Sequence, residues 1–383
     1  MKIQCIRTHY LRAELDQPFA YSQVECTARE TLLVEVVAES GVVGWGECFG
    51  PGAVNQAAVT FVYAPDLLGQ NALQTEVLWH RMWQRTADFA RRGSLMAAIS
   101  GLDIALWDLK GKLLGQPVSE LLGGRFRDEV PGYATGMYFR DLPEPELIDA
   151  LIAEATVHHE QGFRGLKIKL GKNLEFDLWL IQSMREAFPE ATLIADANHA
   201  YDLPEALRTG RALEEARFLW FEEPVTPERP ELYCQLHQKL NVPLAAGETE
   251  QTRYGFQTLL AAGGIDYAQP DLAYCGGLSE ALKIRALATA QGINVIPHAW
   301  GTMVTLAATV HFLATSYREP GRRETNALML ECDRSPNPLR DRLCSTPLQI
   351  HNGLVRVPTA PGLGVEIDPD ALEEFRVQQT EIT

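Results

Sequence analysis

Two lysines separated by one residue lie in a segment that otherwise has the pattern of a buried strand. The segment is GLKIKLGK, residues 165–172, and its lysines are Lys167 and Lys169. Side chains alternate between the two faces of a strand, so both lysines point to the same side. An edge strand with a solvated lysine face would explain a lone pair of this kind. The functional alternative is a pair of positive charges that stabilises an anion and supplies a base.

Carboxylates follow this lysine pair at regular intervals, each at the end of a short apolar run. Asp196 follows TLIA, Glu222 follows LWF and Glu248 follows AAG, at intervals of 26 residues. If each acid occupies the same position on consecutive structural units, the three side chains converge. Converging carboxylates repel one another and raise their own pKa values unless a cation neutralises them. The spacing therefore indicates a divalent cation, and all-oxygen ligands favour Mg²⁺, with Mn²⁺ as a substitute, over Zn²⁺.

Three further polar residues end later apolar runs. Asp271 lies in QPDL, His298 in IPHAW and Glu331 in LMLE. Taken singly, a histidine in a strand is most often structural, and an acid at a strand end is often a solvated loop residue or a helix N-cap. Their succession at the ends of consecutive runs favours a common site.

The elements that would position these residues repeat one pattern. From residue 130 onward, short apolar runs alternate with segments of helical periodicity. Alternating strands and helices form a parallel sheet, and eight such units predict an α/β fold with a (β/α)₈ barrel over residues 126–340. The active site of that fold lies at the C-terminal ends of its strands. The eight runs are VPGYATGMYF, GLKIKL, TLIADANHAY, FLWFEEP, PLAAGE, DYAQPDL, INVIPHAW and ALMLECD.

The first 125 residues follow a different pattern. KIQCIRTHYL, TLLVEVVAES and GVVGWGEC predict antiparallel strands, with a turn at ESG between the last two. Two helical stretches follow, at residues 66–86 and 94–115. These features indicate a separate N-terminal α+β domain over residues 1–125. The tail, residues 341–383, contains short strand runs broken by glycine and proline, and we expect it to return to this domain.

Composition narrows the class of protein. The chain has 383 residues and a formal net charge of −16, which argues against nucleic acid because phosphate binding needs clustered lysine and arginine. It shows neither a signal sequence nor an apolar stretch long enough to span a bilayer, so we expect no export and no membrane insertion. Seven scattered cysteines without a metal-binding spacing fit reduced thiols in the cytoplasm. Local groups decide the binding of a small anion, so a carboxylate ligand remains compatible.

The chain resembles the enolase superfamily, and within it the mandelate racemase subgroup. The resemblance rests on SGLDIALWDLKGKLLGQPVSELLGG, the K-x-K pair, DANHAY, FEEP, AAGE, the segment from QPDL to PHAWGT, and ECDRSPNPLR. It implies an N-terminal capping domain, completed by the tail, over a modified barrel. It also implies one Mg²⁺ per subunit on Asp196, Glu222 and Glu248, and abstraction of the proton α to a substrate carboxylate.

The resemblance gives roles to the other strand-end residues. Lys167 and the cation would stabilise the dianionic intermediate, and Lys169 would be a base whose pKa these two neighbouring charges lower. His298 would act from the opposite face of the substrate, with Asp271 fixing its tautomer. Glu331 would donate a hydrogen bond to a developing carboxylate oxygen, which requires it to be protonated at working pH.

Two reactions are compatible with such a site. If the substrate carries a hydroxyl group on its β-carbon, His298 can expel it and the product is a 2-keto-3-deoxy acid; otherwise, reprotonation from the other face gives racemisation or epimerisation. We favour an acid-sugar dehydratase, because most relatives with both bases have that activity. Relatives that perform cycloisomerisation or dipeptide epimerisation carry a second lysine on the sixth strand, which reads DYAQPDLAYCGG here, so these reactions are disfavoured. An inactive binding protein would lack a base or a ligand, and none is missing.

The sequence leaves the identity of the substrate open. The resemblance places the specificity loops at residues 16–29 and 48–55. Residues able to bind hydroxyl groups or a second carboxylate there are Tyr21, Ser22 and Arg29. Residues able to line an apolar or cation-binding pocket are Phe19, Phe49 and Trp300. Hexonates, pentonates, aldarates and a betaine-like acid are all compatible with this set.

The remaining expectations concern ligands and assembly. Asn198 is expected to face the substrate carboxylate, with Tyr21 and Trp300 as further contacts to the substrate. The expected partner is a small-molecule carboxylate, without nucleic acid or membrane, and the chain is expected to form a homo-oligomer.

Overall fold

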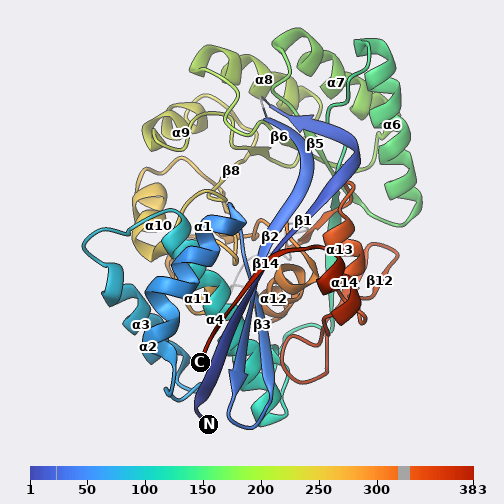
Figure 1. The fold of residues 1–383 in the computed structure, drawn as a ribbon. Helices are drawn as coiled ribbons and strands as arrows, with labels where there is room; N and C mark the ends of the chain where they lie inside the picture. Colours follow the sequence, from blue (N-terminus) through green and yellow to red (C-terminus); the bar gives the residue numbers. More distant parts are fainter. Residues whose placement is uncertain (23, 318–327) are drawn as a thin grey trace.

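Two sheets organise the chain (Figure 1). The computed structural model describes residues 1–22, 24–317 and 328–383. One sheet has four strands in the order β14-β1-β2-β3, and the other has ten strands. Among the described residues, none of the helices combines the length and the hydrophobicity that crossing a bilayer requires.

The larger sheet contains eight parallel strands in chain order, each followed by a helix. They run β10-β9-β8-β7-β6-β5-β4, and β11 pairs with the other side of β4. This is the predicted (β/α)₈ arrangement; Ala327 of the eighth run lies outside the described residues. The strands are β4 (Glu129–Thr135), β5 (Gly165–Lys169), β6 (Thr192–Asp196), β7 (Phe221–Glu222), β8 (Leu244–Ala246), β9 (Tyr267–Ala268), β10 (Asn294–Val295) and β11 (Leu330–Asp333). The helices are α6 (Glu144–Glu160), α7 (Leu174–Ala187), α8 (Leu203–Glu215), α9 (Pro230–His237), α10 (Thr252–Ala261), α11 (Gly277–Ala290), α12 (Met303–Ala314) and α13 (Pro338–Arg342).

The interior of these strands explains why the polar residues meet. A buried cluster formed mainly by large apolar side chains fills the space between the strands. Side chains two positions apart point to the same side of a strand, so the residue two places after each cluster member also points inward, one layer nearer the C-terminal end. The resulting pairs are Ile194 and Asp196, Trp220 and Glu222, Ile296 and His298, and Met329 and Glu331.

The smaller sheet forms the N-terminal domain together with the end of the chain. Its strands are β1 (Ile3–Tyr21), β2 (Val24–Ala38), β3 (Val43–Cys48) and β14 (Arg376–Ile382). Ile6 of β1 lies opposite Ile382 of β14, so the tail returns to this domain as expected. The helices of this domain are α1 (Gly52–Ala57), the π-helix η1 (Ala58–Tyr63), α2 (Ala64–Leu67), α3 (Thr75–Thr86), α4 (Ser94–Leu114) and α5 (Val118–Leu121). The boundaries at residues 125 and 340 stay predictions.

Three local expectations differ from the structure. The loop expected at residues 16–29 is a hairpin, because β1 and β2 stay paired as far as Tyr21 and Val24; residue 23 lies outside the described residues. In Figure 1 this hairpin reaches from the small domain to β5 and β6. The single helix expected at residues 66–86 is interrupted after α2, where Gly69 adopts a positive φ of 72°.

The third difference concerns the first part of the tail. β12 (Ile350–His351) and β13 (Leu354–Arg356) form a hairpin, and β13 pairs with β4 of the barrel rather than with the capping domain. Val355 lies opposite Val130, and both side chains are fully buried. Burial of this apolar pair holds the hairpin on the barrel, while α14 (Pro369–Glu374) and β14 continue to the capping sheet.

A buried carboxylate joins the capping domain to the barrel. Glu47 on β3 is only 2% exposed, and it accepts hydrogen bonds from Thr31 on β2 and from Thr302 and Thr305 at the start of α12. The first N–H groups of a helix have no partner within the helix. The capping domain therefore supplies an acceptor that this barrel helix needs, next to the loop that carries His298.

Candidate active site

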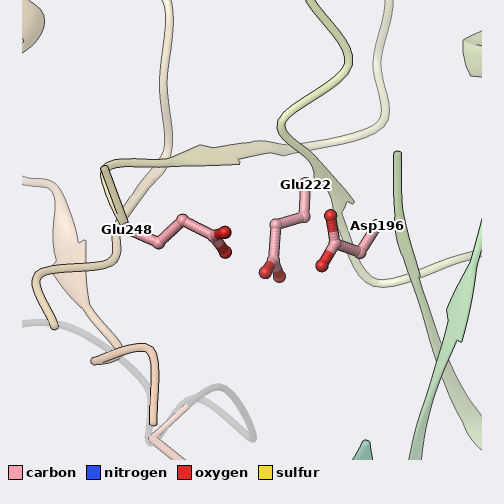
Figure 2. Close-up of side chains that lie close together, drawn as sticks. All are labelled: Asp196, Glu222 and Glu248. Carbon is pink, nitrogen blue, oxygen red and sulfur yellow. The ribbon is translucent and has the colours of Figure 1, made fainter. Parts of the chain in front are cut away.

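Three carboxylates converge at the C-terminal ends of β6, β7 and β8. Asp196, Glu222 and Glu248 each offer an oxygen atom, and these atoms lie within 4.8 Å of one another (Figure 2). Asp196 and Glu222 are fully buried. Burial raises the pKa of Glu222 to about 7, because Lys167 offsets the effect only in part and Asp196 adds repulsion. Negative charge that lysine neighbours offset only in part is thus concentrated at one point.

This carboxylate triad fits a hard divalent cation. All donors are carboxylate oxygens, which suits Mg²⁺ better than Zn²⁺. One oxygen of Glu222 accepts a hydrogen bond of 2.9 Å from the indole N–H of Trp220, which fixes the orientation of the carboxylate. The Oε2 atom of Glu248 is buried and has no hydrogen-bond partner in the described part of the chain. A buried carboxylate oxygen without a hydrogen-bond partner is suited to coordinate a cation.

The two lysines of β5 face the triad from one side. The Nζ atom of Lys167 lies 2.7 Å from Glu222 Oε1 and 2.5 Å from Glu331 Oε1. The Nζ atom of Lys169 lies 2.6 Å from Asp196 Oδ2. Lys167 is fully buried and Lys169 is 5% exposed, so the solvated edge-strand alternative is wrong.

Neighbouring charges set the protonation states of Lys169 and Glu331 before a cation binds. Burial lowers the pKa of Lys169, but Asp196 and the other acidic groups around it outweigh burial and raise it above its usual range. Burial raises the pKa of Glu331, but Lys167 and His298 lower it to about 2. Both shifts hold without a cation at the triad, so a lowered pKa for Lys169 and a protonated Glu331, which we expect for the Mg²⁺-bound site, stay predictions.

Glu331 acts as an acceptor in this structure. It lies on β11, and its Oε1 accepts a hydrogen bond of 2.7 Å from Thr135 on the neighbouring β4. Its Oε2 accepts a bond of 3.0 Å from the backbone N–H of Ala299. Both oxygens are occupied by donors, as a carboxylate requires and as a neutral acid would not need.

Asn198 connects the candidate base to the triad. Its Oδ1 accepts a hydrogen bond of 3.0 Å from Lys169, and its Nδ2 donates one of 3.3 Å to Glu248. Its own backbone has a φ of 40°, in the left-handed region that strains a non-glycine residue. The next residue, His199, has a φ of 63°, and its N–H donates to the backbone oxygen of Glu223. This link between the ends of β6 and β7 helps to hold the strained turn.

Aromatic residues cover Lys169. Its Nζ atom lies 5.4 Å from the ring centre of Tyr21 in the capping hairpin and 5.3 Å from that of Tyr138 in the barrel. Sequence reasoning missed Tyr138, because it was read as part of the apolar run VPGYATGMYF. Its position just after the first barrel strand was the signal that could have found it.

A histidine–carboxylate pair faces the other end of the triad. The Nδ1 atom of His298 lies 2.6 Å from Asp271 Oδ2, and the backbone N–H of Ala273 fixes the other oxygen of Asp271 at 2.7 Å. The Nε2 atom of His298 lies 3.7 Å from Glu248 Oε2. Burial lowers the pKa of His298, but Glu248, Glu331 and Asp271 raise it to about 10. In this state the imidazole is a proton donor.

A cavity of about 490 Å³ lies beside this site, between the capping domain and the barrel. Tyr21 and Trp300, two expected substrate contacts, both line it, whereas Asn198 belongs to the triad end of the site. The cavity also reaches Asp271, so it is continuous with the histidine pair. Its other lining residues include Cys26, Arg29, Thr31, Phe49, Thr302 and Asn337.

Comparison with known proteins assigns this chain to a family. Residues 150–371 match the enolase C-terminal domain-like family, and residues 5–123 match the N-terminal domain of the mandelate racemase / muconate lactonizing enzyme family. The chain belongs to this family of the enolase superfamily, and it is related to enzymes over nearly its whole length.

Individual relatives carry several activities. The chain is 43% identical to the D-galactarolactone cycloisomerase of Agrobacterium fabrum, over 98% of this chain and 99% of that one. It is 34% identical to the arabinonate dehydratase of Saccharolobus solfataricus, over 91% of each. It resembles the crystal structure of the 3,6-anhydro-D-galactonate cycloisomerase from Zobellia galactanivorans with a TM-score of 0.89 and 39% identity, over 99% of this chain and 100% of that one.

A further solved structure bears on the metal. A racemase from Streptomyces coelicolor A3(2) with bound magnesium matches with a TM-score of 0.87 and 29% identity, over 98% of this chain and 100% of that one. These relatives therefore include two cycloisomerases, a dehydratase and a racemase. They give no support to the argument that the missing strand-six lysine disfavours cycloisomerisation.

Proposed function

We propose that the chain catalyses a Mg²⁺-dependent β-elimination on a sugar acid. A proton is removed from the carbon next to a carboxylate, and the oxygen substituent on the following carbon leaves. One observation carries this proposal: two candidate proton-transfer groups flank the same triad. Lys169 contacts Asp196 at 2.6 Å, and His298 lies 3.7 Å from Glu248. A carboxylate bound at the triad would have its α-carbon between them.

The residues of the site would have different roles in this reaction. Bound Mg²⁺ would be held by Asp196, Glu222 and Glu248 and would supply positive charge to the substrate carboxylate. Neutralising these carboxylates removes much of the negative charge that keeps Lys169 protonated, so Lys169 becomes available as a base. Lys167 adds a second positive charge where negative charge develops on the substrate.

His298 would act on the leaving oxygen. Its Nδ1 is bonded to Asp271, so the proton available for transfer is on Nε2, which faces Glu248. Protonation of the β-oxygen by this group allows that oxygen to leave without carrying a full negative charge. Asp271 stabilises the charged imidazole and fixes its orientation, so it is a positioning residue.

The identity of the β-oxygen separates two outcomes of one mechanism. When it is a hydroxyl group, it leaves as water and the product is a 2-keto-3-deoxy acid, which is dehydration. When it belongs to a ring, as in 3,6-anhydrogalactonate, the ring opens and no atoms are lost, which is isomerisation. Similarity to a dehydratase and to two cycloisomerases supports this shared step.

Racemisation or epimerisation is the alternative, since the same two groups could exchange a proton across one carbon. The test is incubation in D₂O with Mg²⁺ and a panel of sugar acids and their anhydro or lactone forms, followed by NMR. We expect a keto-deoxy product from the native enzyme and loss of product with Lys169→Ala and with His298→Asn. Deuterium at the α-carbon with inversion and no elimination would instead establish a racemase. Absence of exchange and of product across the panel would overturn the enzyme proposal.

We keep the expectation of a homo-oligomer as part of this proposal. Light scattering coupled to size-exclusion chromatography measures it directly, and a monomeric mass would contradict it.

A further inference from the structure

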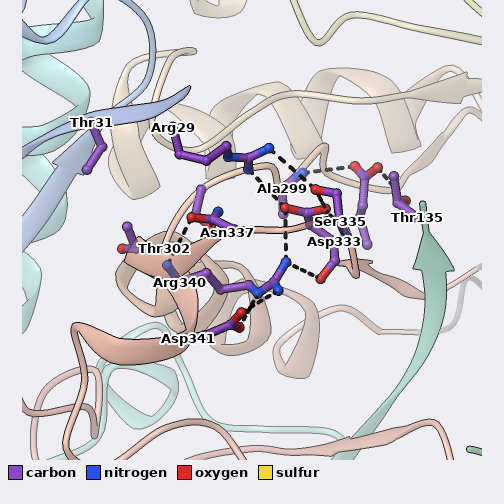
Figure 3. Close-up of polar contacts among 12 residues, drawn as sticks. Arg29, Thr31, Thr135, Ala299, Thr302, Asp333, Ser335, Asn337, Arg340 and Asp341 are labelled. Atoms are coloured by element: carbon purple, nitrogen blue, oxygen red, sulfur yellow. Dashed lines mark hydrogen bonds and ion pairs between the residues drawn. The ribbon is translucent and has the colours of Figure 1, made fainter. Parts of the chain in front are cut away.

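The cavity beside the triad has a cationic wall that the proposed reaction does not use. Arg29 on β2 is only 5% exposed, and its Nη2 atom donates to Asp333 Oδ2 at 2.9 Å (Figure 3). Its Nη1 lies 3.4 Å from Ser335 Oγ. Its Cζ atom lies 3.6 Å from the ring centre of Trp300. Arg29 and Trp300 thus form one continuous face, and both line the cavity.

Arg29 shares its carboxylate partner with a second buried arginine. The Asp333 oxygen that Arg29 contacts is also 3.1 Å from Nη1 of Arg340, so two buried arginines share it. The other Asp333 oxygen accepts a hydrogen bond of 2.6 Å from Ser335. Arg340 has Asp341 as a second carboxylate partner, whereas Arg29 has no second one among the described residues. The arginines and carboxylates of this cluster balance in number, but the one described carboxylate that Arg29 contacts is shared, so the remaining N–H groups of Arg29 can still bind an anionic ligand.

Trp300 adds a second observation that points to a ligand acceptor. Its indole nitrogen is buried and has no hydrogen-bond partner among the described residues. Buried donors of this kind are rarely left unpaired in proteins. An indole N–H and a guanidinium can only donate hydrogen bonds, so the group that satisfies both must offer acceptor oxygens.

Carboxylates that line the cavity do not fill this need. Glu47 is saturated by Thr31, Thr302 and Thr305. Asp271 is committed to His298. Glu30 accepts a hydrogen bond from Tyr10 and lies 3.8 Å from Arg12. These three carboxylates are engaged by other groups, so a ligand is a suitable source of acceptors for the Arg29–Trp300 wall.

We propose that the Arg29–Trp300 wall binds a second carboxyl group of the substrate. This inference rests on the proposed function, in which the first carboxylate lies at the triad. The planar fork of a guanidinium matches a carboxylate, whereas a terminal hydroxymethyl group brings a donor and no charge. The substrate class is then that of aldaric acids and their lactones, in which both ends of the carbon chain offer acceptor oxygens, rather than that of aldonic acids.

The test uses pairs of acids that differ only in the distal group. D-galactarate and D-galactonate form one pair, and D-glucarate and D-gluconate form another. For the native enzyme with Mg²⁺, we expect kcat/KM to favour the diacid of at least one pair by about tenfold or more, because a site built for a hydrogen-bonded group rejects the analogue that lacks it. Equal or faster turnover of the monoacids would overturn the inference and leave the proposed function standing.

Variants of the Arg29–Trp300 wall test whether this wall causes the preference for diacids. Arg29→Gln should abolish the preference for diacids. Arg29→Lys should keep only part of this preference, because lysine has the charge but not the planar fork of the guanidinium. Trp300→Phe keeps an aromatic ring beneath Arg29 but removes the N–H group together with part of the ring surface, so it should weaken the preference. Arg92→Gln makes the same change at an exposed arginine that does not line the cavity, and it should retain the preference. A preference that survives Arg29→Gln would overturn the assignment to this wall.

A binding measurement separates this inference from the proposed reaction. Calorimetry with Lys169→Met and Mg²⁺ should show tighter binding of the diacids than of the monoacids, and addition of Arg29→Gln should remove the difference. If the diacids bind in this way but the native enzyme exchanges no α-proton and forms no product, the subsite stands and the proposed reaction fails. Absence of preferential diacid binding in both pairs would overturn the subsite.

Discussion

The ammonium nitrogen of Lys167 lies 2.5 Å from a carboxylate oxygen of Glu331, and neither residue is more than 1% exposed. This buried contact makes Glu331 a counter-ion. It also places a fixed positive charge within reach of Glu222 at 2.7 Å, so Lys167 bridges two of the strand ends. The protonation states of the site are therefore set by contacts between strands rather than by each residue alone.

The first prediction concerns Glu331→Gln in the metal-free protein. Loss of one partner of a buried ion pair should lower the free energy of unfolding at pH 7 by roughly 1–3 kcal/mol, less than for an isolated pair because Lys167 keeps Glu222. The folded-state pKa of Glu331 is lowered to about 2 from its usual 4.5, so its contribution is complete above pH 4.5 and declines as the pH falls toward 2. Urea unfolding between pH 3 and 7 should show a smaller difference between native and variant at the acid end. A difference that does not shrink would contradict this assignment.

The second prediction is that Mg²⁺ affinity depends on pH through Glu222. Its pKa is raised to about 7 in the metal-free protein, and a ligand must be deprotonated to bind a metal. The affinity should therefore rise by up to about tenfold per pH unit below 7 and level off above it. Titration calorimetry in buffers of different ionisation enthalpy would detect the released proton. Glu222→Gln should lose most of the affinity, and a pH-independent affinity in the native protein would refute the explanation.

The third prediction is that Asp271→Asn lowers turnover on the order of 10²–10⁴-fold while leaving the imidazole in place. Asparagine cannot stabilise the imidazolium and can favour the wrong tautomer. Turnover should be measured across pH, because loss of Asp271 also lowers the pKa of His298, which the folded protein raises to about 10. Asp266→Asn, in the exposed histidine–carboxylate pair that Asp266 forms with His237, serves as the matched control. Native rates in Asp271→Asn would show that the pair is structural.

The fourth prediction is that Glu47→Gln weakens the attachment of the capping domain. The variant keeps the size of the side chain but cannot accept from all of Thr31, Thr302 and Thr305. Buried donors left unsatisfied cost about 1–3 kcal/mol, so we expect a loss of that size in urea unfolding. Thr60→Val, which removes a hydroxyl contact between the π-helix and β14, is a control within the capping domain alone. Unchanged stability of Glu47→Gln would rule out this role.

Much of the site was predictable from local regularities of the sequence. The alternation of side chains in GLKIKL determines that Lys167 and Lys169 share a face, whatever surrounds them. The equal spacing of Asp196, Glu222 and Glu248 follows from a repeated strand–helix unit. A repeated unit places equivalent residues at equivalent positions, so their convergence needed no coordinates.

Contacts between distant segments were decided only by the tertiary structure. Arg29 meets Asp333, 304 residues away, and nothing local in either segment indicates the pairing. Residues 16–29 form a hairpin because β1 and β2 pair with each other, and the expectation of a loop did not include this pairing. Similarly, β13 packs on the barrel because Val355 lies opposite Val130. The ionised state of Glu331 and the raised pKa of Lys169 have the same origin. Electrostatic energies depend on distances and burial in the folded chain, and these distances join residues that sequence order keeps far apart.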